Sequence, residues 1–279
     1  MTASSNGLDA PWGTHRLGAW GAWWLAFAQR RRRGPIGRRL ALWARKIALI
    51  GHGDWIDGEA EGVRIRAGRR GNVSDRKFLF MPAFVDAYER AALARSATDG
   101  GVFVDVGANA GVYALCLANA YRAAGGGRVI AVEPNGAVLP RLRRNIALND
   151  FGSIVEIAEV AVSDAVGSIT FTISSDNLGQ SGVVREETGH RVTVPTTTLL
   201  KLLVDRGVRR VDGLKIDIEG AEDRVLIPFF AEAPDELLPR CVVIEDSRTT
   251  WDPSLMKAFV ARGYRLDREA RMNLVLNRD

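Results

Sequence analysis

The sequence has few cysteines and no long hydrophobic run. Its two cysteines, Cys116 and Cys241, each lie in an apolar stretch, so neither a disulfide framework nor a thiolate metal site is expected. The longest uncharged apolar run near the start covers residues 17–28, whereas a membrane-spanning helix needs roughly 20 residues. A cluster of four arginines follows that run instead of preceding it, which argues against a secretory signal peptide. We therefore expect a cytoplasmic protein.

Positive charge is concentrated near the N-terminus. Residues 1–70 contain 13 Lys and Arg against 5 Asp and Glu, a net charge of +8, which leaves −3 for the rest of a chain whose total is +5. Five of the seven tryptophans also lie in the first 50 residues, and Gly34-Pro35 divides this region into two short helical pieces. We predict a basic, Trp- and Arg-rich helical extension over residues 1–62 and a catalytic domain over 63–279.

Three roles for the extension stay open at this point. Its helices would pack on the body or on a second subunit of a homodimer, or residues 12–46 would make peripheral contact with the inner face of a membrane, or the segment would be a loose tail. Tryptophan beside arginine suits a membrane headgroup layer, because amphipathic rings and cations both find partners there.

From Gly101 onward, short β-branched runs alternate with helical patterns, which is typical of βαβ units and a mostly parallel sheet. Strands are expected at 102–106, 128–133, 154–160, 213–217, 241–245, 264–267 and 272–276, and helices near 111–123, 137–149, 197–206, 220–230 and 254–262. We predict an α/β fold with a Rossmann-like sheet of seven strands, the last antiparallel, flanked by helices. An antiparallel pair, 168–173 with 191–194, interrupts the order around a polar loop, residues 174–190, which we expect to cover a substrate cleft.

A glycine turn follows the first of these strands. Residues 102–111 read Val-Phe-Val-Asp-Val-Gly-Ala-Asn-Ala-Gly, and glycine is needed where a ligand lies against the backbone. The spacing Gly107-x-x-x-Gly111 differs from the dinucleotide fingerprint, which disfavours NAD. Glu133 ends the next strand, 22 residues after Gly111, and an acid at that place can accept hydrogen bonds from both ribose hydroxyls of an adenosine. Together the two features favour an adenosine ligand.

The same segments resemble the FkbM-type methyltransferases. The resemblance rests on Phe103-Val-Asp-Val-Gly-Ala-Asn-Ala-Gly-Val-Tyr-Ala-Leu115, on Val132-Glu-Pro134 with Asn145 and Asn149, on Ala161-Val-Ser-Asp164 with Gly167, and most specifically on Leu214-Lys-Ile-Asp-Ile-Glu-Gly-Ala-Glu222. It implies the class I methyltransferase fold and S-adenosylmethionine-dependent methylation of hydroxyls on sugars, polyketides and related small or lipid-linked molecules. The departure is Leu200, which stands where the family usually shows Asp.

The resemblance also implies a set of cofactor residues. Asp105, Gly107, Ala108, Asn109 and Gly111 would surround the methionine part of S-adenosylmethionine. Glu133 would hold the ribose, residues 159–161 would flank the adenine with Glu159 and Ala161, and Asp217 would also lie against the cofactor.

Three carboxylates are expected at the carboxyl ends of neighbouring strands, where ligands of such sheets bind. They are Asp217 after one strand and Glu245 with Asp246 after the next. Carboxylates that converge repel one another unless a cation or a shared proton intervenes, and a set of oxygen ligands suits Mg²⁺, which would lower the pKa of an acceptor hydroxyl. This layout is similar to that of metal-dependent macrolide sugar O-methyltransferases. In the alternative, Asp217 touches only the cofactor while Glu245 and Asp246 cap a loop.

The proton acceptor is less sharply indicated. Glu219, Glu222 and His190 are the candidates, with Glu219 ahead by its proximity to Asp217, although Glu219 in the alternative only caps the following helix. In the loop at 174–190, Asn177, Gln180 and Ser181 offer donors and acceptors to a hydroxylated molecule.

The function expected from the sequence is therefore O-methyl transfer to a small-molecule or glycan acceptor. The rivals are a noncatalytic nucleotide-binding or scaffold protein and a nucleic-acid methyltransferase. The negative charge of the catalytic body and the lack of an Asn-Pro-Pro-aromatic string argue against the nucleic-acid partner.

Overall fold

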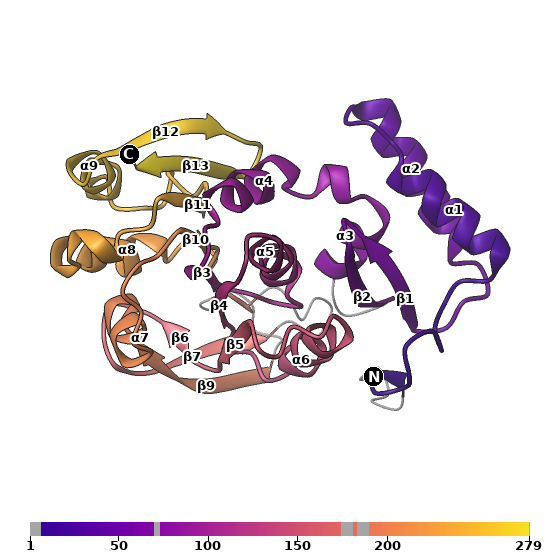
Figure 1. Ribbon diagram of the computed structural model, residues 1–279, viewed down its shortest axis with the longest axis horizontal. Helices are drawn as coiled ribbons and strands as arrows, with labels where there is room; N and C mark the ends of the chain where they lie inside the picture. The colour runs from indigo at the N-terminus through magenta and orange to yellow at the C-terminus, as the bar shows by residue number, and fades with distance from the viewer. Residues whose placement is uncertain (1–6, 70–72, 174–180, 183–189, 279) are drawn as a thin grey trace.

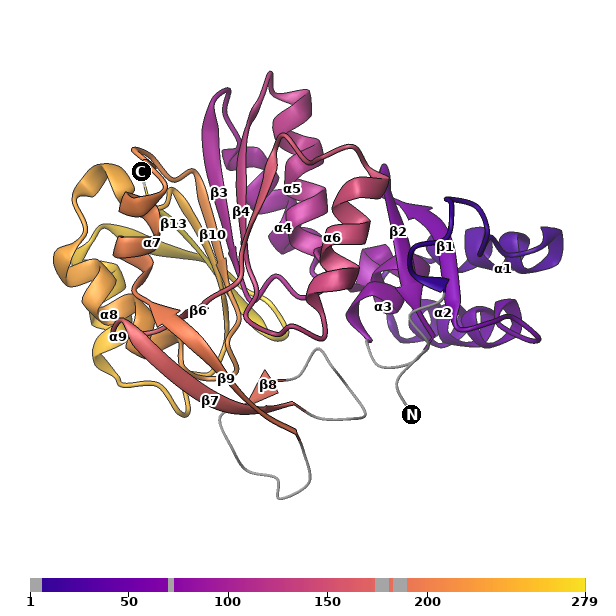
Figure 2. The ribbon, with the colours of Figure 1, turned by 90° about the horizontal axis from the view of Figure 1, so that it is seen from below.

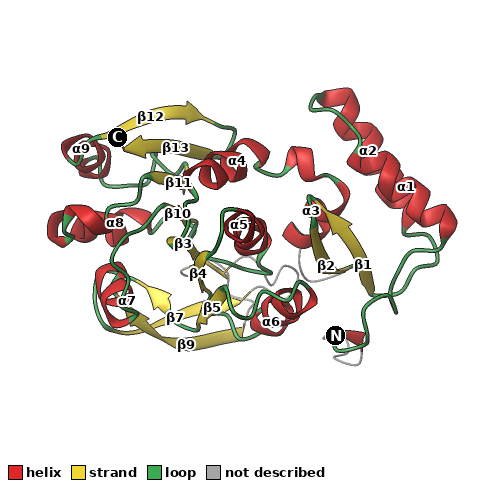
Figure 3. Ribbon diagram, in the orientation of Figure 1, coloured by secondary structure: helices red, strands yellow, loops and turns green. Residues whose placement is uncertain are grey.

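The computed structural model describes residues 7–69, 73–173, 181–182 and 190–278. Figure 1 shows an α/β body with a helical hairpin at the opposite end of the molecule from helices α8 and α9. The body is built on a mixed sheet, and Figure 3 shows helices on both sides of its strands. The N-terminal helices, a two-stranded hairpin and the sheet follow one another along the long axis.

The main sheet has seven strands in the order β12-β13-β11-β10-β3-β4-β5. The strands are β3 (Gly101–Val106), β4 (Gly127–Val132), β5 (Val155–Ala158), β10 (Gly213–Ile216), β11 (Cys241–Glu245), β12 (Tyr264–Glu269) and β13 (Asn273–Arg278). Neighbours from β5 to β11 are parallel, whereas β13 runs antiparallel to both β11 and β12. The predicted seven-stranded sheet with an antiparallel last strand is confirmed.

Each face of the sheet is covered by three helices of the body. Alternate residues of a strand point to opposite faces, so Phe103 packs with α4 (Ala87–Ser96), α5 (Val112–Ala123) and α6 (Leu139–Leu148). Its neighbours Val102 and Val104 pack on the other face with α7 (Leu199–Asp205), α8 (Glu222–Glu232) and α9 (Ser254–Ala261). Both faces are apolar, which explains why the central strands read as continuous hydrophobic runs.

A second sheet interrupts the alternation, as the sequence predicts. It contains β6 (Ala161–Val162), β7 (Gly167–Ile173), β8 (Ser181–Gly182) and β9 (His190–Thr197), and β7 pairs antiparallel with β9. Figure 2 shows β7 and β9 side by side along the lower edge of that view. The strand expected over residues 154–160 is present as β5 but is shorter: it ends at Ala158, and Ala161 already pairs with Thr196 of β9 in the other sheet.

The extension forms two helices on a β-hairpin. Helices α1 (Ala19–Gln29) and α2 (Pro35–Ala48) are separated at the predicted Gly34-Pro35 break, and β1 (Trp55–Ala60) pairs antiparallel with β2 (Val63–Gly68). Helix α3 (Ser74–Phe80) and the short 3₁₀ turns η2 (Pro82–Phe84) and η3 (Asp235–Leu237) complete the described elements. Among the described residues, none of the helices combines the length and the apolar composition needed to cross a bilayer.

Polar side chains connect the β1–β2 hairpin to the rest of the chain. The Arg66 guanidinium is fully buried and pairs with both carboxylate oxygens of Asp57, at 2.6 and 2.8 Å. It also donates to the carbonyls of Leu8 and Ala10, each at 2.6 Å, and so holds the N-terminal segment against β2.

Two asparagines at the C-terminal end of α6 bond to β2 from the side of the α/β body. Asn149 of the α6 C-terminus donates to the Arg64 carbonyl and accepts from the Arg64 amide, both at 2.7 Å. Asn145 accepts from the Arg66 amide and donates to the Ala110 carbonyl, both at 2.9 Å. The hairpin is thereby bonded to the helix that packs beside the glycine turn. The sequence-based division at 62/63, which stays a prediction, falls in the turn between β1 and β2.

Candidate functional site

The glycine turn between β3 and α5 lies where the sequence places the cofactor. The amides of Gly107 and Ala108 both donate to the Val132 carbonyl at the end of β4, each at 3.0 Å. Gly107 has a φ of +81°, and a Cβ there would lie 2.2 Å from the Asp217 carbonyl oxygen. Gly111 has a φ of +93° directly before α5. Only glycine at position 107 therefore lets the end of β3 approach the end of β10 this closely.

Asp105 lies at the buried base of this turn. One carboxylate oxygen accepts from the Ala114 amide in the first turn of α5, at 3.0 Å. The other oxygen is buried and has no hydrogen-bond partner among the described residues. Burial raises the pKa of Asp105 to about 6, although the Lys215 ammonium opposes the shift. A buried carboxylate oxygen without a partner fits a site that receives a donor from a bound ligand.

Glu133 ties the glycine turn to the end of β4. Its two carboxylate oxygens accept from the amides of Asn109 and Asn135, both at 2.8 Å, and its side chain is largely buried. Burial raises the pKa of Glu133, while these two amides oppose the shift. Each oxygen keeps a further lone pair, so the carboxylate can still accept from the ribose hydroxyls that the sequence predicts it to bind.

Replacing Glu133 by glutamine tests this placement. We expect the affinity for S-adenosylmethionine to fall about tenfold to a hundredfold, because one of the two amides loses its acceptor and the ribose loses a charged one. Calorimetric titration measures the change, with Glu156→Gln on β5 as the control for loss of a carboxylate outside the turn. Equal affinity of the Glu133 variant and the native protein would remove Glu133 from the ribose site.

Glu159 and Ala161, the predicted neighbours of the adenine, follow β5. Glu159 is exposed and pairs with Arg143 of α6, and Ala161 is half-buried at the start of β6. Their role toward an adenine stays a prediction.

Lys215 is the functional residue that sequence reasoning missed. It is buried in β10, and its ammonium lies 3.0 Å from the Asp217 carboxylate, 3.4 Å from the Gly107 carbonyl and 5.4 Å from the centre of the Tyr113 ring. Burial acts to lower the pKa of Lys215, but Asp217 and Asp105 outweigh it and raise the pKa above its ordinary value. A charged residue between Leu214 and Ile216 in a buried strand was the available signal.

Asp217 and Glu245 meet at the carboxyl ends of adjacent parallel strands, as the sequence predicts. Ile216 of β10 is paired with Ile244 of β11, so the next residues, Asp217 and Glu245, lie side by side at the ends of the two strands, close enough for each carboxyl to shift the pKa of the other. Burial and the charge of Asp217 raise the pKa of Glu245 to about 8. For Asp217, burial acts to raise the pKa, but the Lys215 ammonium holds it below its ordinary value. The closeness of the two carboxyl groups thus favours the protonated form of Glu245 and the ionised form of Asp217.

Asp246 does not join these two carboxylates. Its two oxygens accept from the Arg248 guanidinium, both at 2.8 Å, and this pairing lowers the pKa of Asp246. In the part of the chain that the structure describes, no group of three or more His, Cys, Asp or Glu side chains is arranged to hold a metal ion. The three carboxylates expected from the sequence therefore do not come together, because Asp246, the third of them, is paired with Arg248.

The loop after β10 separates the roles of the two remaining glutamates. Glu222 is fully buried and accepts from the amides of Ile218 and Gly220, at 2.9 and 3.2 Å, and from the Trp251 indole at 2.8 Å. It therefore shapes the loop and has no free access to an acceptor. Glu219 is exposed on that loop with a φ of +58°, although its carboxyl group is partly shielded from water, and this partial desolvation and then the charge of Asp217 raise its pKa.

The predicted lid falls largely outside the described residues. Asn177 and Gln180 lie in the part that is not described, and Ser181 and His190 are described only as backbone in β8 and β9. The roles proposed for them from the sequence stay predictions.

Comparison with known proteins points to one family. Residues 105–266 match the family model described as the methyltransferase FkbM domain. The chain is 29% identical over 211 residues to methyltransferase sdnD of Sordaria araneosa, in an alignment that covers 64% of this chain and 76% of that protein. It is 27% identical over 194 residues to the AMB antimetabolite synthetase AmbE of Pseudomonas aeruginosa, covering 56% of this chain but only 9% of that much longer protein.

Among solved structures, the METTL16 methyltransferase domain aligns with a TM-score of 0.47 and 13% identity, over 92% of this chain and 90% of that one. The family match extends over the glycine turn, Glu133, Lys215 and the paired carboxylates of Asp217 and Glu245.

Proposed function

The chain belongs to the FkbM family of methyltransferases, and from this premise we propose that it carries the methyl group of S-adenosylmethionine to a hydroxyl oxygen of a sugar, glycan, lipid-linked or natural-product acceptor. Dependence on S-adenosylmethionine is the property of the family. The choice of oxygen as the accepting atom is our own proposal, and the carboxyl pair of Asp217 and Glu245 is the observation that carries it.

The residues of the glycine turn fit S-adenosylmethionine. The unpartnered buried oxygen of Asp105 suits an ammonium donor such as the amino group of the methionine part. Gly107 leaves the backbone bare where a Cβ would block close approach, and Glu133 offers acceptors for the ribose. When bound, the cofactor supplies a methyl group on a positively charged sulfur, which an oxygen nucleophile displaces in line.

The chain's own residues then have to take the proton of the hydroxyl. Glu245 is half-buried beside Asp217, and its pKa of about 8 lies near working pH, as general base catalysis favours. We assign the role of proton acceptor to Glu245 instead of Glu219, because Glu219 is exposed whereas Glu245 is half-buried. Lys215 holds Asp217 in its ionised form and in place.

The name of one relative, AmbE, supports a small-molecule acceptor. The AmbE protein is named an antimetabolite synthetase, and the sdnD protein is named a methyltransferase. The test is to incubate the full chain with S-adenosylmethionine and a panel of hydroxylated sugars, lipid-linked sugars and polyketides. S-adenosylhomocysteine is then quantified, and the methylated atom is located by NMR. Methylation on nitrogen, or binding of S-adenosylmethionine without turnover across the panel, would count against this function.

The side chains present do not fit Mg²⁺, so no step is routed through a metal. Asp217 is paired with the Lys215 ammonium, burial and the charge of Asp217 favour the protonated form of Glu245, and Asp246 is held by Arg248. We expect a chelator to leave the rate of S-adenosylhomocysteine formation unchanged, and added Mg²⁺ to raise it by less than twofold. A rate that collapses with chelator and returns with Mg²⁺ alone would contradict this prediction.

A further inference from the structure

The helical hairpin at the N-terminus exposes an aromatic surface. Five rings contact one another across α1 and α2: Trp20, Trp23, Trp24, Phe27 and Trp43, here called the aromatic platform. Trp20, Trp23 and Trp43 are 68%, 57% and 54% exposed. On α2 the platform continues into aliphatic side chains one and two turns away, with Ile36 at 74% exposure. Apolar side chains of this size are rarely left in water in such a contiguous group.

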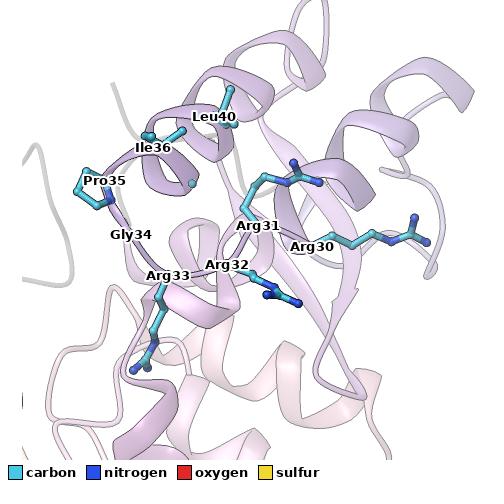
Figure 4. Close-up of a pocket in the computed structure, with 9 residues that line it drawn as sticks. Arg30, Arg31, Arg32, Arg33, Gly34, Pro35, Ile36 and Leu40 are labelled. Carbon is cyan, nitrogen blue, oxygen red and sulfur yellow. The ribbon is translucent and has the colours of Figure 1, made fainter.

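The same helices present a face of unbalanced positive charge. Residues 10–53 contain nine arginines and lysines and no aspartate or glutamate. The connection from α1 to α2, residues 30–34 and here called the arginine turn, holds four of these cations. It borders an opening of about 540 Å³ whose lining also includes Ile36 and Leu40. Figure 4 shows the four arginine side chains spreading from the turn, with Ile36 and Leu40 beside them on α2.

An arginine of the arginine turn contacts the aromatic platform directly. The Arg31 guanidinium lies 4.0 Å from the centre of the Phe27 ring, and Ile36, Leu40 and Trp43 recur at the helical spacing that places them on one face of α2. The structure therefore combines exposed tryptophans, exposed aliphatic side chains and a local excess of arginines on the α1–α2 hairpin.

We propose that the α1–α2 hairpin docks the protein on an anionic lipid surface, with the aromatic platform at the headgroup boundary and the arginine turn on the lipid phosphates. Tryptophan and arginine are the side chains that bind this layer best, and a polybasic segment adds affinity for anionic lipid. A second copy of the chain fits less well, because a two-fold contact through this surface would bring like charges together. A nucleic acid fits less well because exposed Ile36 and Ile50 offer a base neither stacking nor hydrogen bonds.

Docking in this way would place the methyltransferase site near the lipid. The Arg33 guanidinium donates to the Ala83 carbonyl at 2.6 Å, in the η2 turn. Three residues further along, Asp86 precedes α4, which packs against β10, the strand that carries Lys215. The arginine turn thus contacts the segment that borders the cofactor site.

The experiment is flotation of the full-length protein with vesicles of phosphatidylcholine alone and of phosphatidylcholine with phosphatidylglycerol. We expect binding to the anionic vesicles, accompanied by a blue shift of tryptophan emission and weakened by salt. The double variant Arg30→Gln/Arg32→Gln should bind about thirty-fold more weakly, and Trp20→Ser/Trp23→Ser should lose both the binding and the emission shift.

Matched controls separate the effect of the hairpin surface on vesicle binding from the effects of total charge and of misfolding. Arg209→Gln/Arg224→Gln removes two exposed arginines of the catalytic body and should leave vesicle binding unchanged. Affinity for S-adenosylmethionine should be native in all variants, which shows that they are folded. Equal binding to neutral and anionic vesicles, or equal loss in the control variant, would overturn the proposal. The proposal would also be overturned if the protein bound no vesicles and light scattering showed a dimer that the Trp20→Ser/Trp23→Ser variant does not form. The same holds if the protein bound no vesicles but bound an oligonucleotide through the arginine turn.

Discussion

Glutamine at position 245 is expected to lower kcat by about a hundredfold to ten-thousandfold, while the affinity for S-adenosylmethionine changes by less than about threefold. The reason is that an amide cannot accept the proton of the attacking hydroxyl, whereas the glycine turn and Glu133, which hold the cofactor, are unchanged. Single-turnover measurement of methyl transfer and calorimetric titration of the cofactor separate the two quantities.

The pH dependence of the native protein gives an independent test of the same assignment. Because the pKa of Glu245 is about 8, its base form is lost as the pH falls below that value. The ratio kcat/KM, which reports the free enzyme, should therefore decline about tenfold for each pH unit below 8 and level off above it. The Glu245→Gln variant should lack this decline.

Two neighbouring carboxylates serve as controls for Glu245. Asp246→Asn removes a carboxylate of the next residue, but one that is held by Arg248, so kcat should stay within about threefold of native. Glu219→Gln should likewise retain most activity. If instead the Glu219 variant lost its activity and the Glu245 variant kept it, the proton acceptor would be the residue that the sequence alone favours.

Replacing Arg66 by alanine is expected to lower the free energy of unfolding by about 3–5 kcal/mol. The change leaves the buried Asp57 carboxylate without its partner and leaves the carbonyls of Leu8 and Ala10 without a donor. Urea denaturation measures the loss, and Arg66→Lys, which keeps the charge but not the two-pronged geometry, should show an intermediate value.

Arg64 provides the matched control on the same strand. It lies two residues away, is half-exposed and meets Glu59 at 3.5 Å, so Arg64→Ala should cost less than about 1 kcal/mol. If the two alanine variants unfolded at the same urea concentration, the buried network would not be what holds the N-terminal segment.

The parts of the site that the sequence predicts are those encoded by local pattern. The turn from Gly107 to Gly111 follows a buried strand, and Glu133 ends the next one, so their meeting follows from the geometry of a parallel βαβ unit. The approach of Asp217 to Glu245 follows in the same way from adjacent parallel strands. In each case the position is set by where a strand ends.

The parts that the sequence does not predict depend on partners chosen in three dimensions. Asp246 was expected to face the site, but the outcome was decided by a competing arginine, Arg248, whose reach around a turn the pattern does not reveal. Besides Asp57, the partners of Arg66 include the backbone carbonyls of Leu8 and Ala10, more than 50 residues earlier, which carry no sequence signature. The ion pair of Lys215 with Asp217 is also not predicted, although a lysine in an apolar strand is an unusual feature that indicates a buried partner.

The pairing of β1 with β2 has a practical consequence for dissecting this protein. Six residue pairs join the two strands, and Asn145 and Asn149 grip β2 from the other side. A shortened chain that began at Val63 would keep β2 but strip it of its neighbour, leaving an open sheet edge that invites aggregation. Truncation would then confuse misfolding with loss of the basic helices, so point changes on the outer surface of those helices are the informative way to study them.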